Sequence, residues 1–205
     1  TVDLNTPVKN PWRNKDVAPR NDYLAYPFEE LEYSPVLDFQ NMTPNNENDV
    51  NISTSFPIDL EKSSYKVFDF GRNLTGFIVF KVYADSPTKL FFAFDEKLNS
   101  GKLDWKRLGC HNIVSVELLE KGEYEFESIE PYTFRFLQLV TTTGNVKINQ
   151  IGIRLYENPD SQRAKFDSSS KELDEIFEAG RATFAQNAVD IFMDCPHRER
   201  AGWLC

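Results

Sequence analysis

The feature that most constrains the fold is a series of short runs of β-branched and aromatic residues between Tyr65 and Ile153. Turn signals separate these runs, among them Gly71, Ser86-Pro87 and Asn99-Ser100-Gly101. Runs of this kind, closed by Gly, Pro, Asn and Ser, are typical of β-strands. The expected strands are 66–70, 76–84, 89–94, 112–118, 134–140 and 146–153.

Polar residues alternate with apolar ones in the last two of these runs. Gln138 and Asn149 each lie between apolar neighbours, which is the alternation of half-buried antiparallel strands. Turns are expected at 121–123 and 143–145, where Gly stands beside polar residues. Several such strands in succession predict a mainly β fold, an antiparallel β-sandwich or jelly roll.

Near Pro159 the apolar residues change from the periodicity of strands to that of a helix. Ser169, with Glu172 three residues later, fits a capping box at the start of this helix. We expect the helix to run from about 170 to 188. Its apolar face is formed by residues at helical spacing, which are Leu173, Ile176, Phe177, Gly180 and Phe184. Within this chain, only the β-domain is available to cover that face.

These patterns divide the chain into three parts. Residues 1–60 are rich in Pro and Asn with little periodicity, as in an extended arm or the end of an upstream domain. Residues 61–160 form the expected β-sandwich domain. Residues 161–205 form a linker helix and the truncated start of a second, helical domain. We expect truncation because the last residues, 202–205, are mostly apolar, with neither a cap nor a polar tail.

Charge and cysteine content exclude some classes of function. The net charge is −9 and the pI about 4.8. An acidic surface repels phosphate backbones and no basic stripe is present, so no nucleic-acid partner is expected. Acidity with 14% aromatic residues suits neutral polar ligands such as sugars, although composition alone favours a generic soluble acidic protein. Three cysteines, an odd number, do not form a disulfide framework.

Neither a membrane span nor a signal peptide is expected from the hydropathy of the chain. No run approaches the roughly 20 apolar residues that cross a bilayer. The first residues, 1–5, lack a charged region followed by an apolar one. A mature protein from which a signal peptide had been removed would look the same. The compartment therefore stays open: periplasmic or extracellular in that case, cytoplasmic otherwise.

The chemistry is concentrated in the segment 194–203, which we call the motif segment. It contains Asp194, Glu199, two arginines and Trp203. Pro196 ends any helix that reaches it, so Glu199 is expected on a loop at a helix end, where catalytic side chains are common. Cationic neighbours lower the pKa of a carboxyl group, and burial against an aromatic ring raises it. The two carboxyl groups of the segment can therefore differ in pKa, as separate acid and base roles require. From these residues alone, a structural salt-bridge network is the favoured alternative.

Three phrases, in the same order along the chain, resemble α-L-rhamnosidases of glycoside hydrolase family 78. The first is 68–76, Phe-Asp-Phe-Gly-Arg-Asn-Leu-Thr-Gly, and the second is 130–136, Glu-Pro-Tyr-Thr-Phe-Arg-Phe. The third is Asp-Cys-Pro at 194–196 followed by Arg-Glu-Arg at 198–200 and Gly-Trp at 202–203. The resemblance covers roughly residues 65–205. It implies a β-sandwich followed by one or two helices that begin an (α/α)6 barrel.

The resemblance also implies roles for residues of the motif segment. Family members remove terminal α-L-rhamnose with inversion, and Glu199 matches the position of their general acid. Asp194 matches a carboxylate that holds sugar hydroxyls, while Arg198 and Trp203 match positions lining the same pocket. Inverting enzymes need a second carboxylate about 6.5–9.5 Å from the acid. The family supplies this base from the remainder of the barrel, so the chain by itself is expected to be inactive. No cofactor is implied, and Cys195 and Cys205 do not make up a metal ligand set.

Two departures from the family pattern put the substrate in doubt, the residue at position 197 and the Arg198–Glu199 spacing, which is the shorter of the family's variants. His197 stands where other members often carry an uncharged polar residue, and we interpret it as a partly exposed turn histidine. In the first phrase, Asp69, Arg72 and Asn73 are interpreted as structural, since Asp and Asn commonly satisfy backbone groups in turns.

The competing hypothesis is a non-catalytic β-sandwich that binds carbohydrate or braces a neighbouring domain. Aromatic side chains exposed on one sheet face would support sugar binding, and the candidates are Tyr83, Phe92, Phe94 and Trp105. Most of these are expected to be core residues instead. A protein–protein interaction domain is a further alternative with no specific feature behind it.

Overall fold

The computed structural model describes residues 55–105, 112–196, 200 and 202. Most of the region predicted as an N-terminal arm therefore lies outside the described residues. In the described part, no helix is long and apolar enough to cross a membrane. The elements, in chain order, are β1 Ile58–Leu60, β2 Tyr65–Ala84, β3 Thr88–Asp95, β4 Leu98–Asn99, β5 Lys102–Leu103, β6 Ile113–Leu118, β7 Gly122–Glu127, β8 Tyr132–Thr141, β9 Val146–Leu155, the 3-10 helix η3 Pro159–Arg163 and the helix α3 Lys171–Asn187.

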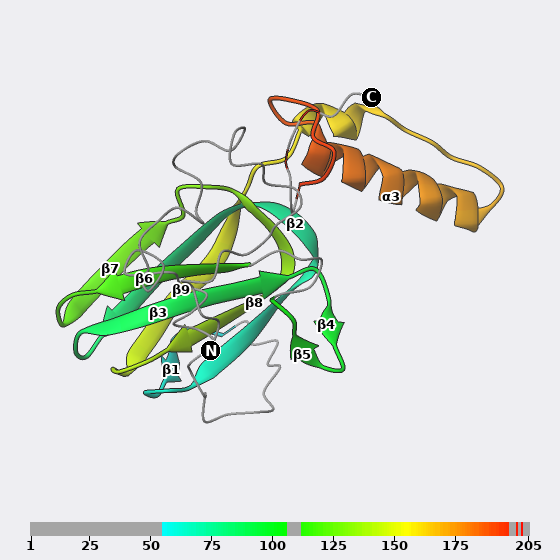
Figure 1. Cartoon of the computed structure of the whole chain (residues 1–205). Coiled ribbons are helices and arrows are strands. Elements are labelled where there is room, and N and C mark those ends of the chain that lie inside the picture. Colours follow the sequence, from blue (N-terminus) through cyan, green and yellow to red (C-terminus); the bar gives the residue numbers. More distant parts are fainter. Residues whose placement is uncertain (1–54, 106–111, 197–199, 201, 203–205) are drawn as a thin grey trace, which may run out of the picture. The chain divides into compact units, whose positions relative to one another are not determined.

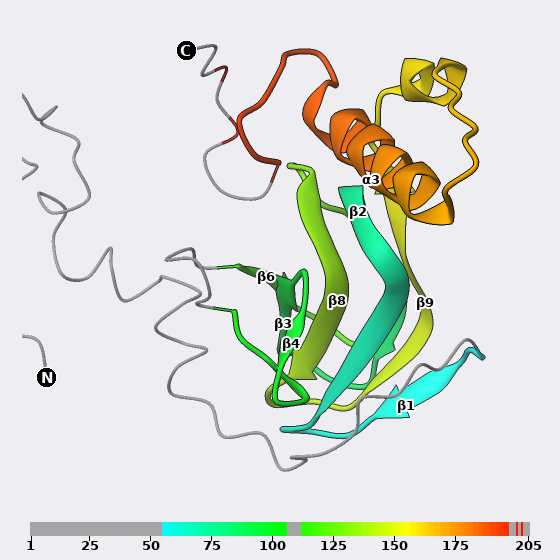
Figure 2. The same cartoon turned by 90° about the vertical axis from the view of Figure 1, so that its right-hand side faces the viewer.

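The long strand β2 organises the antiparallel sheet into two layers (Figures 1 and 2). Its first half, up to Gly76, pairs with β8, which pairs in turn with β3, and β3 with β6. Its second half pairs with β9 on one side and β7 on the other, and β1 pairs with β9. The mainly β architecture and the sandwich are confirmed.

The core lies between the two layers and is made of large apolar side chains. Phe80 of β2 and Phe92 of β3 belong to different layers, and their ring centroids are 4.7 Å apart. Both are 1% exposed. Burying an aromatic side chain of this size contributes about 1.5–3 kcal/mol relative to leaving it in water. The apolar residues of the runs therefore hold the two layers together.

The predicted strands are all present, but the structure differs at two places in the sheet and adds the short strands β1, β4 and β5, which were not predicted. The runs 66–70 and 76–84 are parts of one strand, β2, because the register against β8 shifts between Asp69 and Leu74 without ending the pairing. Gly71 lies in this irregularity with φ 81°, a left-handed conformation that glycine adopts without strain. The turn expected at 121–123 instead leads directly into β7, a strand in which exposed Glu residues alternate with the partly buried Tyr124 and Phe126.

The predicted helix is confirmed as α3, but its cap and its buried face are not as expected. The N-cap is Ser170, whose side chain makes no capping bond, so the Ser169–Glu172 capping box is wrong. Residues of the expected apolar face stay exposed: Leu173 51%, Ile176 61% and Phe184 46%. The helix instead buries Ala185 and Gln186, because polar contacts tie its last turn to the end of the sheet.

Candidate functional site

A short reversal of the chain, residues 188–193, connects the end of α3 to the motif segment. The helix is closed by the N–H of Ala188, which donates to the carbonyl of Phe184 at 2.9 Å. An isolated antiparallel bridge then joins Ala188 to Phe192, and the N–H of Met193 donates to the carbonyl of Asn187 at 2.7 Å. This tight reversal delivers the chain to Asp194 and Cys195.

The structure describes one of the predicted site residues. Asp194 is exposed, and the thiol of Cys195 donates to its Oδ2 at 3.4 Å. Glu199, Arg198 and Trp203 lie outside the described residues, as does His197. The predicted roles of these residues therefore stay predictions. Exposure of Asp194 is compatible with contact to a polar ligand.

Two described residues of the motif segment, Pro196 and Arg200, are attached to the start of β8 and the residues just before it. The hydroxyl of Thr133 donates to the carbonyl of Pro196 at 2.9 Å. The guanidinium of Arg200 donates through Nη1 to the carbonyl of Pro131 at 2.7 Å and through Nη2 to Glu130 Oε2 at 2.8 Å. Two phrases that lie far apart in the sequence thus meet in space. Sequence reasoning noted both phrases but did not predict these contacts.

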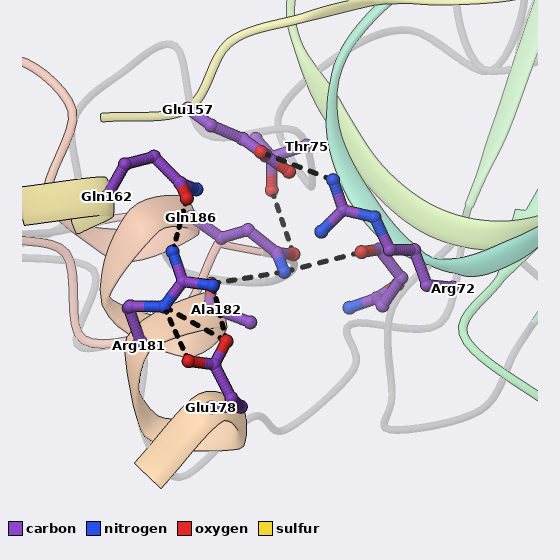
Figure 3. A network of polar contacts seen from close by, with 9 residues as sticks. Arg72, Thr75, Glu157, Gln162, Glu178, Arg181, Ala182 and Gln186 are labelled. Atoms are coloured by element: carbon purple, nitrogen blue, oxygen red, sulfur yellow. Dashed lines mark hydrogen bonds and ion pairs between the residues drawn. The ribbon is translucent and has the colours of Figure 1, made fainter. Parts of the chain in front are cut away.

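The first phrase, 68–76, lies at the junction between the sheet and α3, where hydrogen bonds connect it to the last turn of the helix. Gln186 lies beside Thr75, with 3.3 Å between Thr75 Oγ1 and Gln186 Oε1, and its amide nitrogen donates to the carbonyl of Asn73 at 3.3 Å. Arg72 forms an ion pair with Glu157 at 3.6 Å. Figure 3 shows Gln186 between these residues of β2 and the polar side chains of its own helix. The interpretation of Arg72 as structural fits this ion pair.

A second connection between sheet and helix passes through Asn158, just before η3. Its N–H donates to the carbonyl of Ala185 at 2.8 Å, and its side-chain amide donates to the carbonyl of Ala188 at 2.5 Å. Both acceptors lie at the end of α3, where backbone carbonyls lack partners within the helix. Asn158 therefore fixes the point from which the motif segment starts.

Asp69 has the structural role expected of it. Its Oδ1 accepts from the N–H of Gly71 at 2.7 Å. Both carboxylate oxygens also accept from Arg135, at 2.7 and 2.8 Å. The hydrogen bonds from Arg135 hold the pKa of Asp69 below its ordinary value, against the opposing effect of burial. This pair cross-links β2 and β8 next to the irregularity in β2.

Tyr132 stands between the core and the motif segment. Its ring packs on Phe94 with centroids 4.8 Å apart. Burial raises the pKa of the Tyr132 phenol, and the nearby charge of Glu130 raises it further, while Arg200 lowers it. The phenol thus remains protonated at neutral pH and is able to donate a hydrogen bond beside the motif segment.

The candidates for a sugar-binding sheet face are mostly not available at the surface. Phe92 and Phe94 are buried at 1% and 3% exposure. Tyr83 and Trp105 are partly buried. A hollow of about 520 Å³ lies instead between α3 and the stretch before it, lined by Gln162, Ala164, Lys165, Phe166, Asp167, Glu178 and Arg181. None of its lining residues belongs to the predicted site.

Possible metal ligands are not grouped in the described part of the chain. Among residues 55–105, 112–196, 200 and 202, no three His, Cys, Asp or Glu side chains lie together as a metal site requires. Cys205, the partner considered for Cys195, is outside these ranges.

Comparison with known proteins shows which family the two parts of the chain resemble. Residues 60–154 match the model of the bacterial α-L-rhamnosidase concanavalin-like domain, and residues 161–205 match that of the bacterial α-L-rhamnosidase 6 hairpin glycosidase domain. This portion of the chain is α-L-rhamnosidase-like. The two matched ranges adjoin where the sheet gives way to η3 and α3.

Solved structures of rhamnosidases share the fold. A family 78 rhamnosidase of Bacillus sp. GL1 is 25% identical with a TM-score of 0.60, over 74% of this chain and 15% of that one. A rhamnosidase from Klebsiella oxytoca with rhamnose bound is 20% identical with a TM-score of 0.55, over 70% of this chain and 31% of that one. The α-L-rhamnosidase-like chain thus spans less than a third of these relatives. No protein with a curated description matches it.

Proposed function

We propose that the chain is the front portion of an inverting glycosidase that removes terminal α-L-rhamnose from glycans or glycosides. The observation that carries the proposal is the match of the glycosidase-domain model to residues 161–205, which contain the whole motif segment. The bound rhamnose in the Klebsiella relative supports the substrate class. The proposed division of the chain remains a sandwich at 61–160 and a glycosidase-domain start at 161–205, with β1 adding residues 58–60 to the sheet.

The proposed mechanism assigns proton donation to Glu199. Its carboxylic acid protonates the glycosidic oxygen as the bond to the sugar breaks, while a second carboxylate draws a proton from the attacking water. Asp194, Arg198 and Trp203 bind the sugar in this scheme. The second carboxylate belongs to the remainder of the barrel in the full-length protein, so the chain of 205 residues does not turn over substrate by itself.

Substitution of Glu199 in the full-length protein tests the proposal. Glu199→Gln keeps the shape of the side chain but removes its proton-donating ability, and we expect kcat on a methoxyphenyl α-L-rhamnoside to fall about 10²- to 10⁴-fold. Glu123→Gln, an exposed carboxylate on β7, serves as the control and should keep wild-type turnover. NMR of the first-formed sugar should show the inverted anomer. Wild-type turnover in Glu199→Gln would remove this residue from the mechanism.

A further inference from the structure

The motif segment is held at two points that flank the proposed acid. Pro196 precedes the stretch 197–199 and Arg200 follows it, and both contact β8 or the residues just before it. The β8 side contributes a buried hydroxyl from Thr133, a backbone carbonyl from Pro131 and a carboxylate from Glu130. Three hydrogen bonds thus fix the chain on both sides of Glu199.

The hydroxyl of Thr133 is the donor in its hydrogen bond to Pro196. Thr133 is 1% exposed, and the carbonyl of Pro196 can only accept, so the Thr133 proton is committed to it. Thr75 has one hydroxyl proton and two acceptors within reach of it, Thr133 Oγ1 at 2.8 Å and Gln186 Oε1 at 3.3 Å. A chain of hydrogen bonds runs from β2 through β8 to the motif segment. Buried networks of this kind are rigid when their groups are satisfied.

The second attachment also involves the backbone of Arg200, which has an unusual conformation. Its φ is 52°, the left-handed conformation that residues other than glycine rarely adopt. Such a conformation persists where the surroundings hold it, and here the guanidinium is bound to both Glu130 and Pro131. The strained residue directly follows Glu199 in the chain.

We infer that Thr133 and Arg200 are positioning residues for the general acid. The inference rests on the proposed function of Glu199. Proton transfer requires the acid to lie within hydrogen-bond reach of the glycosidic oxygen, and small misplacements are costly to the rate. The β-sandwich then contributes to catalysis indirectly, because it holds Pro196 and Arg200, the described residues on either side of the acid.

The test exploits the dependence of the reaction on its leaving group. A dinitrophenolate leaves without protonation, whereas a methoxyphenolate needs the acid. In the full-length protein, Thr133→Val should lower kcat/KM for the methoxyphenyl rhamnoside about 10- to 100-fold, but that for the dinitrophenyl rhamnoside less than about 3-fold. Thr133→Ser keeps the hydroxyl and should restore both values.

The matched control is Thr141→Val at the other end of β8. Thr141 is equally buried, at 0% exposure, and its hydroxyl donates to the carbonyl of Gly144 at 2.7 Å. This variant should lose stability without any selectivity between the two substrates. Equal losses on both substrates in Thr133→Val, or no loss on either, would overturn the inference.

Two further variants separate the possible failures. If Thr133→Val does not fold, Glu130→Gln, which weakens the exposed attachment of Arg200, is judged by the same selectivity between substrates, with no selectivity counting against the inference. Glu199→Gln tests the proposed function separately, because an acid that is absent must show the strongest leaving-group selectivity. Selectivity in Glu199→Gln but not in the Thr133 and Glu130 variants leaves the function in place and removes the positioning role.

Discussion

At the scale of single residues, the pair Asp69–Arg135 shows how a phrase shared by a family can be structural. The Asp69 side chain is 9% exposed and that of Arg135 40%, so the pair is only partly shielded from water. Two-point hydrogen bonding between a guanidinium and a carboxylate is stronger and more directional than a simple charge contact. The Arg135 guanidinium also lies over the Phe136 ring, 4.8 Å from its centroid. Asp69 thereby fixes both the turn at Gly71 and the neighbouring strand.

We expect this pair to make stability depend on pH. Because the pKa of Asp69 is lower in the folded chain, its contribution is present above the unfolded pKa, about 3.9. That contribution is lost as the pH falls through the lower, folded pKa. Asp69→Asn keeps an acceptor for Gly71 and should lower the unfolding free energy at pH 7 by about 1 kcal/mol. Urea unfolding measures the free energy of unfolding of wild type and variant. The difference between the two proteins should be smaller below pH 3 than at pH 7.

The control for this prediction is Glu127→Gln. Glu127 also binds an arginine of a neighbouring strand at two points, Arg154 at 2.6 and 2.8 Å, but its side chain is 42% exposed. Its effect should be smaller because water screens the pair. A larger pH-dependent loss in Glu127→Gln than in Asp69→Asn would contradict the role given to burial.

At the scale of elements, the exchange of partners along β2 depends on Gly76. This residue pairs with Tyr132 of β8 and with Leu155 of β9. A Cβ built at position 76 would lie 2.2 Å from the carbonyl oxygen of Arg154. Because the obstacle is backbone, no side-chain rotation can relieve it. The close approach allows one strand to serve both layers of the sandwich.

Gly76→Ala should therefore destabilise the chain by about 1–3 kcal/mol, as expected for overpacking against a backbone atom. Gly122→Ala at the start of β7 is the control, since a Cβ there meets nothing within 4 Å. The control should change stability by less than about 0.5 kcal/mol. Urea denaturation of both variants measures the difference. Equal stability of the two variants would show that β2 and β9 separate readily at this point.

Local patterns predicted the elements well where one property decided them. The alternation along β8 and β9 and the helical spacing before Phe184 gave the correct elements. The capping box was wrong because Ser168 and Asp174 make the hydrogen bonds at the start of the helix instead. The strand β7 was missed because strand pairing depends on partners distant in the sequence. Gly71 was predicted to end a strand, because the local sequence is the same for an irregularity within a strand and for a turn.

At the scale of the whole molecule, the sequence predicted the family from three phrases but not how these phrases meet. Residues 68–76, 130–136 and the motif segment converge on the junction of Thr75, Thr133 and Gln186. The contacts there are between single polar atoms, which neither periodicity nor composition encodes. Of the predicted site, Asp194 is placed at the surface, while the assignments of Glu199, Arg198 and Trp203 depend on the resemblance.

The exposed apolar side of α3 yields a prediction about the full-length protein. Ile176 is 61% exposed, so most of its side chain is left uncovered by the described part of the chain. If the remainder of the proposed barrel packs there, Ile176→Gln should lower the Tm of the full-length protein by at least about 2 °C. In the chain of 205 residues, the same change should alter stability by less than about 0.5 kcal/mol, because no partner is present to be lost. Glu172→Gln, on the exposed first turn of α3, removes a favourable charge at the helix N-terminus and should have the same small effect in both proteins. Thermal unfolding followed by circular dichroism would show the effect of Ile176→Gln growing with the added domain, and an equal effect in both proteins would mean that this side of the helix faces solvent throughout.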